Sequence, residues 1–175
     1  MSGSICCTVY LDDQILSWLI MGKEIERKYL VDHEKWQCIT KSIGKLYRQG
    51  YLLTDPGKTI RVRVTPTNGY LTIKGLTVGA TRPEYEYEIP LSDAVELLDN
   101  FSVAELSKIR YIINYNNKIW EVDEFLKDNE GLIVAEIELQ SENEEFDIPG
   151  WISNEVTGQE KYYNSNLTLT PYKNW

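Results

Sequence analysis

The sequence predicts a mainly β protein of the α+β class, in which an eight-stranded antiparallel sheet closes into a β-barrel tunnel with a polar, charged interior and peripheral helices. Three observations predict this fold class. Apolar and polar residues alternate along eight segments, turn-forming residues separate several of them, and charged residues recur two positions apart along most of them. Because successive side chains of a strand point to opposite faces, the charges of each segment share one face.

The predicted strands follow one another along most of the chain. They span residues 23–30, 46–53, 58–65, 69–76, 83–90, 106–115, 117–125 and 132–140. Turn-forming residues stand between several of them, in "DPGK" (55–58), "TNG" (67–69) and "NYNNK" (114–118). The clearest hairpin is the one at "TNG", because an alternating run stands on each side of it.

Helices are fewer in the prediction and lie between or after the strands. Residues 32–45, 91–101 and 141–146 are expected to be helical, with Ser92 as the N-cap of the second helix. Residues 164–175 are polar and predict a loosely held tail.

One domain accounts for a chain of 175 residues. We expect an N-terminal extension at 1–21 outside the core fold, a tunnel domain at 22–165 and a C-terminal tail at 166–175. The apolar run "ILSWLIM" (15–21) is shorter than a bilayer-spanning helix, and acidic rather than basic residues precede it. It therefore favours a tail or a docking segment over a targeting signal.

Composition excludes several classes of function. The net charge of −9 and the pI near 4.7 argue against nucleic acid and anionic membranes as partners. Cys6, Cys7 and Cys38 are odd in number and lack metal-site spacing, which predicts a cytoplasmic protein without a disulfide framework. With His33 as the single histidine, catalytic triads and histidine-rich metal sites are excluded.

The charged faces of the predicted strands are the main functional signal. In "GKEIERKYLV" (22–31), Glu24, Glu26 and Lys28 share one face of a strand. Equivalent pairs or triplets follow at Arg61 and Arg63, Thr72 and Lys74, Glu84, Glu86 and Glu88, Lys108 and Arg110, Glu121 and Asp123, and Glu136 and Glu138. Basic and acidic sets are segregated by strand, whereas a solvated face usually mixes small polar residues. We therefore expect the charged faces to point inward in a closed barrel.

An interior of this composition implies a particular chemistry. Several carboxylates in one cavity repel one another unless cations bind or their pKa values rise. Oxygen ligands without histidine or cysteine suit Mg²⁺ or Mn²⁺. Arginine and lysine opposite them would hold a multiply anionic substrate. Together these groups are what phosphoryl transfer needs, although no P-loop motif is present.

The chain resembles the CYTH family, also called triphosphate tunnel metalloenzymes, and within it the short bacterial-type inorganic tripolyphosphatases. The hallmark E-x-E-x-K is matched by Glu24, Glu26 and Lys28. Further motifs follow in the family's order: "RVR" (61–63), "TIK" (72–74), "EYE" (86–88), "KIR" (108–110), "EVD" (121–123), "EIE" (136–138) and "EVTGQEKYYN" (155–164). The resemblance covers roughly residues 22 to 165. It implies a tunnel that binds a linear triphosphate together with a divalent metal.

The resemblance also implies roles for individual residues. The expected contacts to phosphate oxygens are made by Lys28, Arg61, Arg63, Lys74, Lys108, Arg110 and Lys161. The expected ligands of Mg²⁺ or Mn²⁺ are Glu24, Glu26, Glu136 and Glu138, assisted by Asp123 or Glu121. A Lys28–Tyr51 pair would act in catalysis by orienting an attacking water, with ordinary packing as the alternative for Tyr51. Glu86 and Glu88 would hold basic side chains in position. Trp36, Trp120 and Trp151 are each expected to pack rather than to form a base pocket.

Several functions are compatible with this site. The leading expectation is metal-dependent hydrolysis of inorganic tripolyphosphate to diphosphate and phosphate. An adenylate cyclase and a thiamine or nucleoside triphosphatase of the same family are alternatives. From another class, a non-catalytic module that binds polyphosphate or a nucleotide stays open. The many intact acids favour catalysis over binding alone, because binding needs the bases only.

Strands whose polar residues face the barrel interior and whose apolar residues face outward are also typical of outer-membrane barrels. A missing secretion signal, ungrouped aromatic residues and the outward-facing Arg27 argue against that class and against a membrane partner. An apolar barrel exterior that helices cover only in part would favour a homodimer.

Overall fold

A computed structural model describes residues 24–78 and 81–175 of the chain. The predicted N-terminal extension at 1–21 and the first residue of the first predicted strand lie outside the described residues. The domain boundaries at 21, 165 and 175 stay predictions.

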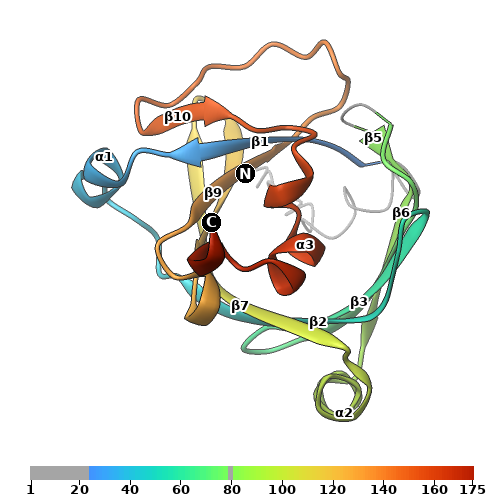
Figure 1. The fold of residues 1–175 in the computed structure, drawn as a ribbon. Helices are drawn as coiled ribbons and strands as arrows, with labels where there is room; N and C mark the ends of the chain where they lie inside the picture. The colour runs from blue at the N-terminus through green and yellow to red at the C-terminus, as the bar shows by residue number, and fades with distance from the viewer. Residues whose placement is uncertain (1–23, 79–80) are drawn as a thin grey trace, which may run out of the picture.

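Within the described residues, ten strands form one antiparallel sheet, which confirms a mainly β fold with few helices. The strands are β1 (Glu24–Val31), β2 (Lys45–Asp55), β3 (Lys58–Val64), β4 (Gly69–Lys74), β5 (Thr81–Arg82), β6 (Glu84–Ile89), β7 (Ala104–Tyr115), β8 (Lys118–Phe125), β9 (Ile133–Glu138) and β10 (Ile152–Glu155). Their order in the sheet is β10-β1-β9-β8-β7-β2-β3-β4-β6, and β5 pairs with β1. Figure 1 shows how strongly this sheet curves.

All eight predicted strands are present, with ends shifted by a few residues. The sequence analysis missed β5 and β10, which have two and four residues. Segments this short carry too few alternating positions to be recognised. Both are strands because they pair with β1: Thr81 lies opposite Ile25, and Glu155 lies opposite Tyr29.

β5 brings the β6 end of the strand order to β1, which lies next to β10 at the other end. Glu24 of β1 lies opposite Arg82 of β5, and β6 pairs with β4 along its whole length. Only Pro83 separates β5 from β6. The segment 81–89 therefore contacts β1 with its first residues and β4 with the rest.

The helices are α1 (His33–Cys38), α2 (Leu91–Phe101) and α3 (Asn164–Leu169), with short 3₁₀ turns at η2 (Lys127–Asn129), η3 (Glu160–Tyr162) and η4 (Tyr172–Asn174). The helix predicted at 32–45 is too long, since α1 ends at Cys38. Ile39 is already extended, and the chain runs into β2 from Lys45. Asp32 caps α1 by accepting a hydrogen bond from the Lys35 backbone N–H at 3.2 Å.

Two details of the helix prediction are wrong. Ser92 is not an N-cap, because α2 begins one residue earlier, after Pro90, and the Ser92 hydroxyl donates to Asp93 instead. Residues 141–143 form a bend and a turn and residues 144–146 are irregular, so the predicted helix is absent there. There Glu144 accepts hydrogen bonds from Lys118 and from the Gln140 backbone N–H. Phe146 packs on Trp120, so long-range contacts set the conformation of this segment.

The segment 164–175 is not loosely held. It contains α3 and η4, and Leu167 is fully buried in a cluster with Leu106, Phe125 and Tyr162. The Tyr172 amide donates to Asn129 at 2.8 Å, which fixes the last turn on η2. The sequence analysis did not predict this packing, because most residues of the segment are polar and only a few of its side chains contact the rest of the protein.

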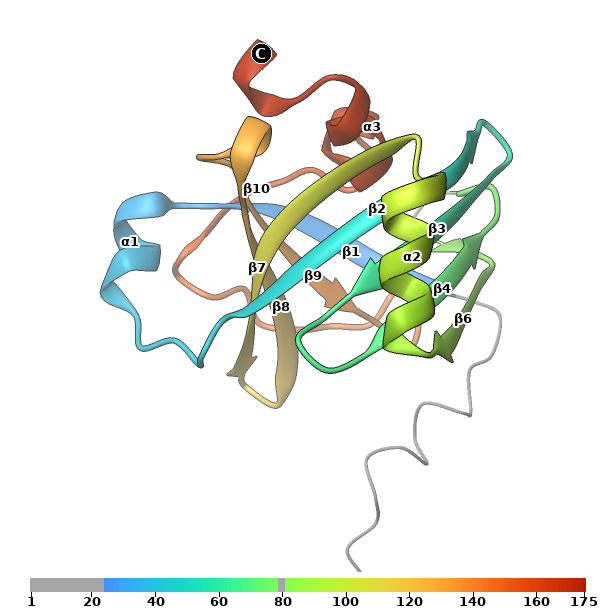
Figure 2. The same cartoon turned by 90° about the horizontal axis from the view of Figure 1, so that it is seen from below.

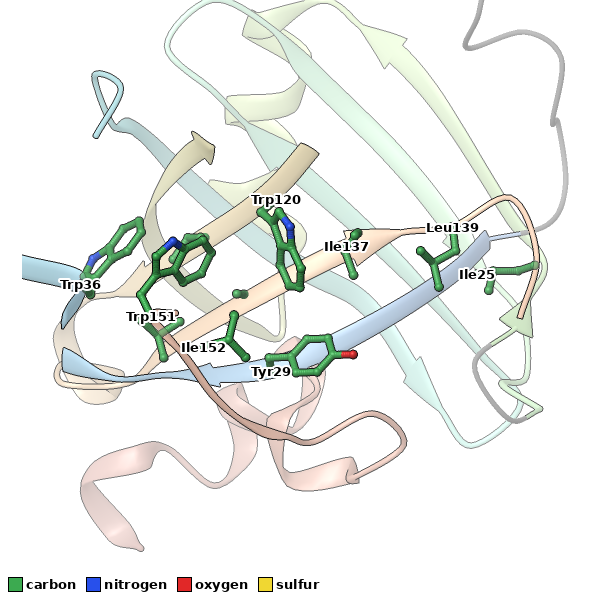
Figure 3. Packing of buried hydrophobic residues seen from close by; sticks show 11 residues of the cluster. Ile25, Tyr29, Trp36, Trp120, Ile137, Leu139, Trp151 and Ile152 are labelled. Carbon is green, nitrogen blue, oxygen red and sulfur yellow. The ribbon is translucent and has the colours of Figure 1, made fainter. Parts of the chain in front are cut away.

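Apolar side chains cover the outer face of the sheet. The largest cluster packs Trp36 of α1 and Trp151 against Trp120 and Tyr29 on β8 and β1 (Figure 3), which confirms that the tryptophans pack. Ring centroids of Trp120 and Trp151 are 5.8 Å apart in an edge-to-face arrangement. Figure 2 shows α2 lying across β2, β3 and β4, where Leu98 and Ala94 bury Val62. No helix of the described part of the chain has the length and apolar content needed to cross a membrane.

Candidate active site

The alternate residues of the strands that face away from these clusters form what we call the charged face. It holds five basic side chains that are each less than a tenth exposed: Lys28, Arg61, Lys74, Lys108 and Arg110. Lysine and arginine are almost never this buried unless they are paired. The sheet therefore gathers these cations for a purpose other than solubility.

Antiparallel register sets which charges meet. Lys28 of β1 lies opposite Glu136 of β9, and Arg110 of β7 lies opposite Asp123 of β8. Directly opposed residues have their Cβ atoms about 5 Å apart, so acid and base can pair across each ladder. The segregation of acids and bases by strand thus becomes a network of ion pairs between neighbouring strands.

The deepest part of this network is built on Asp123, which has no solvent exposure. Its carboxylate accepts hydrogen bonds from Lys108 Nζ at 2.5 Å and from Arg110 Nε and Nη2 at 2.7 and 2.6 Å. Burial would raise the pKa of Asp123, but the charges of Arg110 and Lys108 outweigh it and hold the pKa below its usual range. For Lys108, burial and the neighbouring Arg110 lower the pKa to about 8.

A second group joins β1 to β9. The ammonium of Lys28 pairs with Glu136 and lies 3.0 Å from Glu26 Oε1. Glu136 also accepts from Arg110 at 3.0 Å, so it connects the two groups. Burial opposes ionisation of Glu136, but Lys28 and Arg110 hold its pKa well below the usual range.

A third group surrounds Glu24 at the start of β1. Its carboxylate lies 3.1 Å from Lys74 Nζ and 2.7 Å from Arg82 Nε, and Lys74 also pairs with Glu84 at 2.6 Å. Arg82 reaches Glu26 as well, at 3.1 Å. Burial and the neighbouring Glu24 raise the pKa of Glu84 to about 7.

The fourth group holds the two arginines of β3. Glu86 accepts hydrogen bonds from Arg63 at 2.7 Å and from Arg61 at 3.3 Å, in agreement with the expected role of Glu86. Glu88 has no basic partner within residues 24–78 and 81–175; near the end of β6 it accepts from the Asn68 amide at 2.8 Å instead. The Nε atoms of Arg61 and Arg63 are buried and have no hydrogen-bond partner in the described residues.

Two further acids complete the predicted metal-ligand set. Glu121 pairs with Arg110, whereas Glu138 has no basic partner among the residues that the structure describes. Burial raises the pKa of Glu138, and so do the charges of Glu24, Glu121 and Glu26. Glu138 and its three acidic neighbours are thus four carboxylates, and Glu138 has no basic partner within the described residues. Such a donor set suits a hard divalent cation. As arranged, however, no three acidic, histidine or cysteine side chains of residues 24–78 and 81–175 stand in ligating geometry.

Two predicted site residues lie apart from the expected contacts. The Tyr51 ring is buried on the charged face, but its hydroxyl accepts from Gln49 Nε2 at 3.4 Å and is not bonded to Lys28. Lys161 is exposed on η3, where its ammonium lies over the Tyr162 and Trp175 rings, 4.9 and 4.6 Å from their centroids. The structure thus does not bring Lys161 into the four groups.

The sequence analysis missed Arg82 and Tyr47. Arg82 stands two residues before Glu84 and so continues the same face, but Pro83 interrupts the strand pattern that would have revealed it. The Tyr47 ring contacts the guanidinium groups of both Arg63 and Arg110, whose Cζ atoms are 5.4 and 5.5 Å from its centroid. No charge signal marks such a residue in the sequence.

Two cavities lie beside β1, one on the charged face and one on the opposite face. A cavity of about 20 Å³ remains beside Glu26, Lys28 and Arg82, enough for about one water. A larger cavity of about 820 Å³ lies against the opposite face of β1, beside Arg27 and Tyr29.

At one end, the charged face becomes apolar. There Leu30, Leu106, Phe125 and Val134 of four strands pack against Leu167 of α3. The charged groups therefore lie between this apolar end and the opposite end of the strands.

Known proteins match most of this chain. A model of the CYTH domain family matches residues 22–171. An inorganic triphosphatase of Acetivibrio thermocellus is 50% identical over 156 residues, which are 89% of this chain and 99% of that protein. An inorganic triphosphatase of Nitrosomonas europaea is 32% identical over 155 residues, 84% of this chain and 97% of that protein. A crystal structure described as an inorganic triphosphatase superposes with a TM-score of 0.58 and 29% identity, covering 83% of this chain and 94% of that one.

Proposed function

Because this chain belongs to the CYTH domain family, we propose that it is an inorganic triphosphatase, which hydrolyses tripolyphosphate to diphosphate and phosphate. Relatives that carry this name are 50% and 32% identical to the chain over nearly their whole lengths. The leading expectation from the sequence is the same activity. The charged face supplies the chemistry that this activity needs.

The observation that carries the proposal is the burial of cations on one face. Lys28, Arg61, Lys74, Lys108 and Arg110 come from four different strands and are all nearly excluded from solvent. Buried donors without partners are costly, and Arg61 and Arg63 each keep one at Nε. A linear triphosphate supplies acceptor oxygens to several of these groups at once.

We infer that the sheet closes into the expected eight-stranded tunnel. The strands β1, β9, β8, β7, β2, β3 and β4 follow one another by pairing, and the segment 81–89 pairs with β4 on one side and with β1 on the other. A closed sheet of eight strands encloses a space that side chains and one small ligand can fill. The four ion-pair groups would line that space.

The acidic side chains fit a divalent cation. Glu24, Glu26, Glu136 and Glu138, with Glu121, would hold Mg²⁺ or Mn²⁺, and the unpaired Glu138 among its acidic neighbours supports this ligand set. Such an ion neutralises charge on the phosphate oxygens and lowers the pKa of bound water. Asp123 is already bonded to Lys108 and Arg110, so we assign it to positioning those two bases.

The basic residues then have separable roles. Arg61, Arg63, Lys74, Lys108 and Arg110 bind the phosphate chain and stabilise the diphosphate that leaves. Lys28 binds the terminal phosphate and, with Tyr51, orients the attacking water for in-line displacement. Glu86 and Asp123 keep the arginines and Lys108 extended toward the substrate. These roles account for most of the buried charge of the protein.

The first test measures phosphate release from tripolyphosphate, ATP and thiamine triphosphate, each with Mg²⁺, Mn²⁺ or EDTA. Products are separated by chromatography, so that cyclic AMP from an adenylate cyclase would be detected. We expect metal-dependent cleavage of tripolyphosphate at a kcat/KM well above that for the other two. If kcat/KM is higher for ATP or thiamine triphosphate, that compound and not tripolyphosphate is the substrate.

A pair of variants separates an enzyme from a module that only binds polyphosphate or a nucleotide. We expect E136Q and E138Q to lower kcat by about 10²–10³-fold, as the loss of transition-state charge stabilisation does, while tripolyphosphate binding persists. E155Q is the matched control, because Glu155 lies on β10 and pairs with Arg27 on the outer face. Equal loss in E155Q would show a structural effect. If the wild type binds tripolyphosphate tightly but does not cleave it, the protein is a non-catalytic binding module and not an enzyme.

A further inference from the structure

Arg82 is a half-buried base that the proposed function leaves without a role. Its guanidinium donates from Nε to Glu24 at 2.7 Å and from Nη2 to Glu26 at 3.1 Å. The side chain of Arg82 is 20% exposed, and those of Glu24 and Glu26 are 19% and 18% exposed. One arginine thus occupies both acids with which β1 begins.

Strand pairing holds the backbone of Arg82, and its side chain lies beside a small cavity. Arg82 belongs to the two-residue strand β5, which lies beside the start of β1 (Figure 1). The pairing of the two strands places Arg82 opposite Glu24. The side chain borders the cavity of about 20 Å³ together with Lys28, Thr77 and Thr157. This cavity holds about one water, so a guanidinium that left the acids toward Lys28 would also have to displace the side chains around it.

A divalent cation and Arg82 compete for the same oxygens. A metal ligated by Glu24 and Glu26 needs the lone pairs that Arg82 now uses, and a guanidinium beside a dication is repelled. The arginine must then turn away, but its strand keeps it close. Its planar donors match phosphate oxygens in bidentate geometry.

We propose that Arg82 is a further substrate-binding residue, which occupies the Glu24–Glu26 carboxylates until a divalent cation displaces it and then binds the phosphate chain. This inference rests on the proposed function and adds a residue to it. In the free protein Arg82 compensates the acidic pair. In the loaded protein it links arrival of the metal to binding of the substrate.

The test measures Mn²⁺ binding to the metal-free protein by electron paramagnetic resonance, and KM for tripolyphosphate at saturating Mn²⁺. For R82Q we expect Mn²⁺ to bind about tenfold more tightly, since a competing cation is gone, and KM to rise about tenfold, since a phosphate ligand is gone. R82K should lie between R82Q and the wild type in both measurements, because an ammonium keeps the charge but not the bidentate geometry.

R27Q is the matched control, because Arg27 follows Glu26 directly on β1 but pairs with Glu155 on the outer face. It should leave both quantities within about twofold of the wild type, as an exposed pair contributes little. If R82Q lowers the melting temperature but changes neither Mn²⁺ affinity nor KM, Arg82 only ties β5 to β1 and the inference is overturned. If the wild type neither binds Mn²⁺ nor cleaves tripolyphosphate, the proposed function fails and the inference with it.

Discussion

Single residues on the charged face depend on one another to an unusual degree. Asp123 is the clearest case, because it is fully buried and its carboxylate accepts three hydrogen bonds from Lys108 and Arg110. A buried ion pair adds little net stability over an apolar pair, but removing one partner leaves an uncompensated charge. The consequence is that Asp123 can be essential to the fold without touching the substrate.

We predict that D123N lowers the free energy of unfolding by about 3–5 kcal/mol, because it leaves Lys108 and Arg110 buried with a neutral partner. Urea denaturation measures the change. D99N is the control, since Asp99 makes the same kind of pair with Arg48 at the surface, 52% exposed, and should cost below about 1 kcal/mol. Equal losses in the two variants would contradict the role of burial.

The stability difference between the wild type and D123N should also depend on pH. The pKa of Asp123 is lowered by folding, so its ionised form contributes stability above the unfolded pKa of about 4 and loses it as the pH falls through the folded value. The difference between wild type and D123N should thus stay constant from pH 7 to about pH 4 and narrow only below it. A difference that shrinks already between pH 7 and pH 5 would contradict the lowered pKa.

At the scale of elements, helix α2 is held on the sheet by close approach rather than by its cap. Pro90 at the N-cap makes no side-chain hydrogen bond, and Ser92 lies inside the first turn. Gly69 at the start of β4 lies directly under Ala94, which is fully buried. A Cβ atom on residue 69 would lie 2.5 Å from the Ala94 Cβ, so the helix approaches the sheet where the side chain is missing.

We predict that G69A lowers the free energy of unfolding by about 1–3 kcal/mol, because the added methyl group forces α2 away from β4. G57A in the turn between β2 and β3 is the control: a Cβ there meets no atom within 4 Å, and stability should change by less than about 0.5 kcal/mol. Thermal denaturation of both variants measures the effect. If G69A is as stable as G57A, α2 must be free to shift.

At the scale of the whole molecule, the fold inverts the usual arrangement of polar and apolar faces. Helices α1 and α2 lie outside the curved sheet (Figure 1). They and the segment that carries Trp151 cover the apolar faces of the strands, so the charged faces lie on the opposite, concave side. Such an arrangement is costly unless a ligand neutralises part of the charge. The free protein compensates by pairing its own acids and bases across the face.

This cost predicts that an anionic ligand stabilises the protein even without a metal. Tripolyphosphate in EDTA, at a hundredfold excess over its Kd, should add about 2.7 kcal/mol, which is about 5–10 °C in melting temperature for a chain of this size. Sodium chloride at matched ionic strength is the control and should shift the melting temperature by no more than about 2 °C. R61Q should reduce the shift. An equal effect of tripolyphosphate and sodium chloride would contradict a specific anion site.

The sequence by itself determined the strands and their charged faces. Alternation has a period of two in any strand, so Glu24, Glu26 and Lys28 share a face whatever lies opposite them. The E-x-E-x-K motif and the basic pairs that follow it were therefore enough to predict the family and its activity, and the family match confirms the resemblance.

Only the tertiary structure decided how the charges combine and which weak elements form. Asp123 holds Lys108, and Arg82 occupies Glu24 and Glu26, because strands far apart in sequence meet there. The short strands β5 and β10 and the docked segment 164–175 likewise depend on partners elsewhere in the chain. The physical reason is the same in each case: local pattern sets the direction of a side chain, whereas its partner is set by long-range pairing and packing.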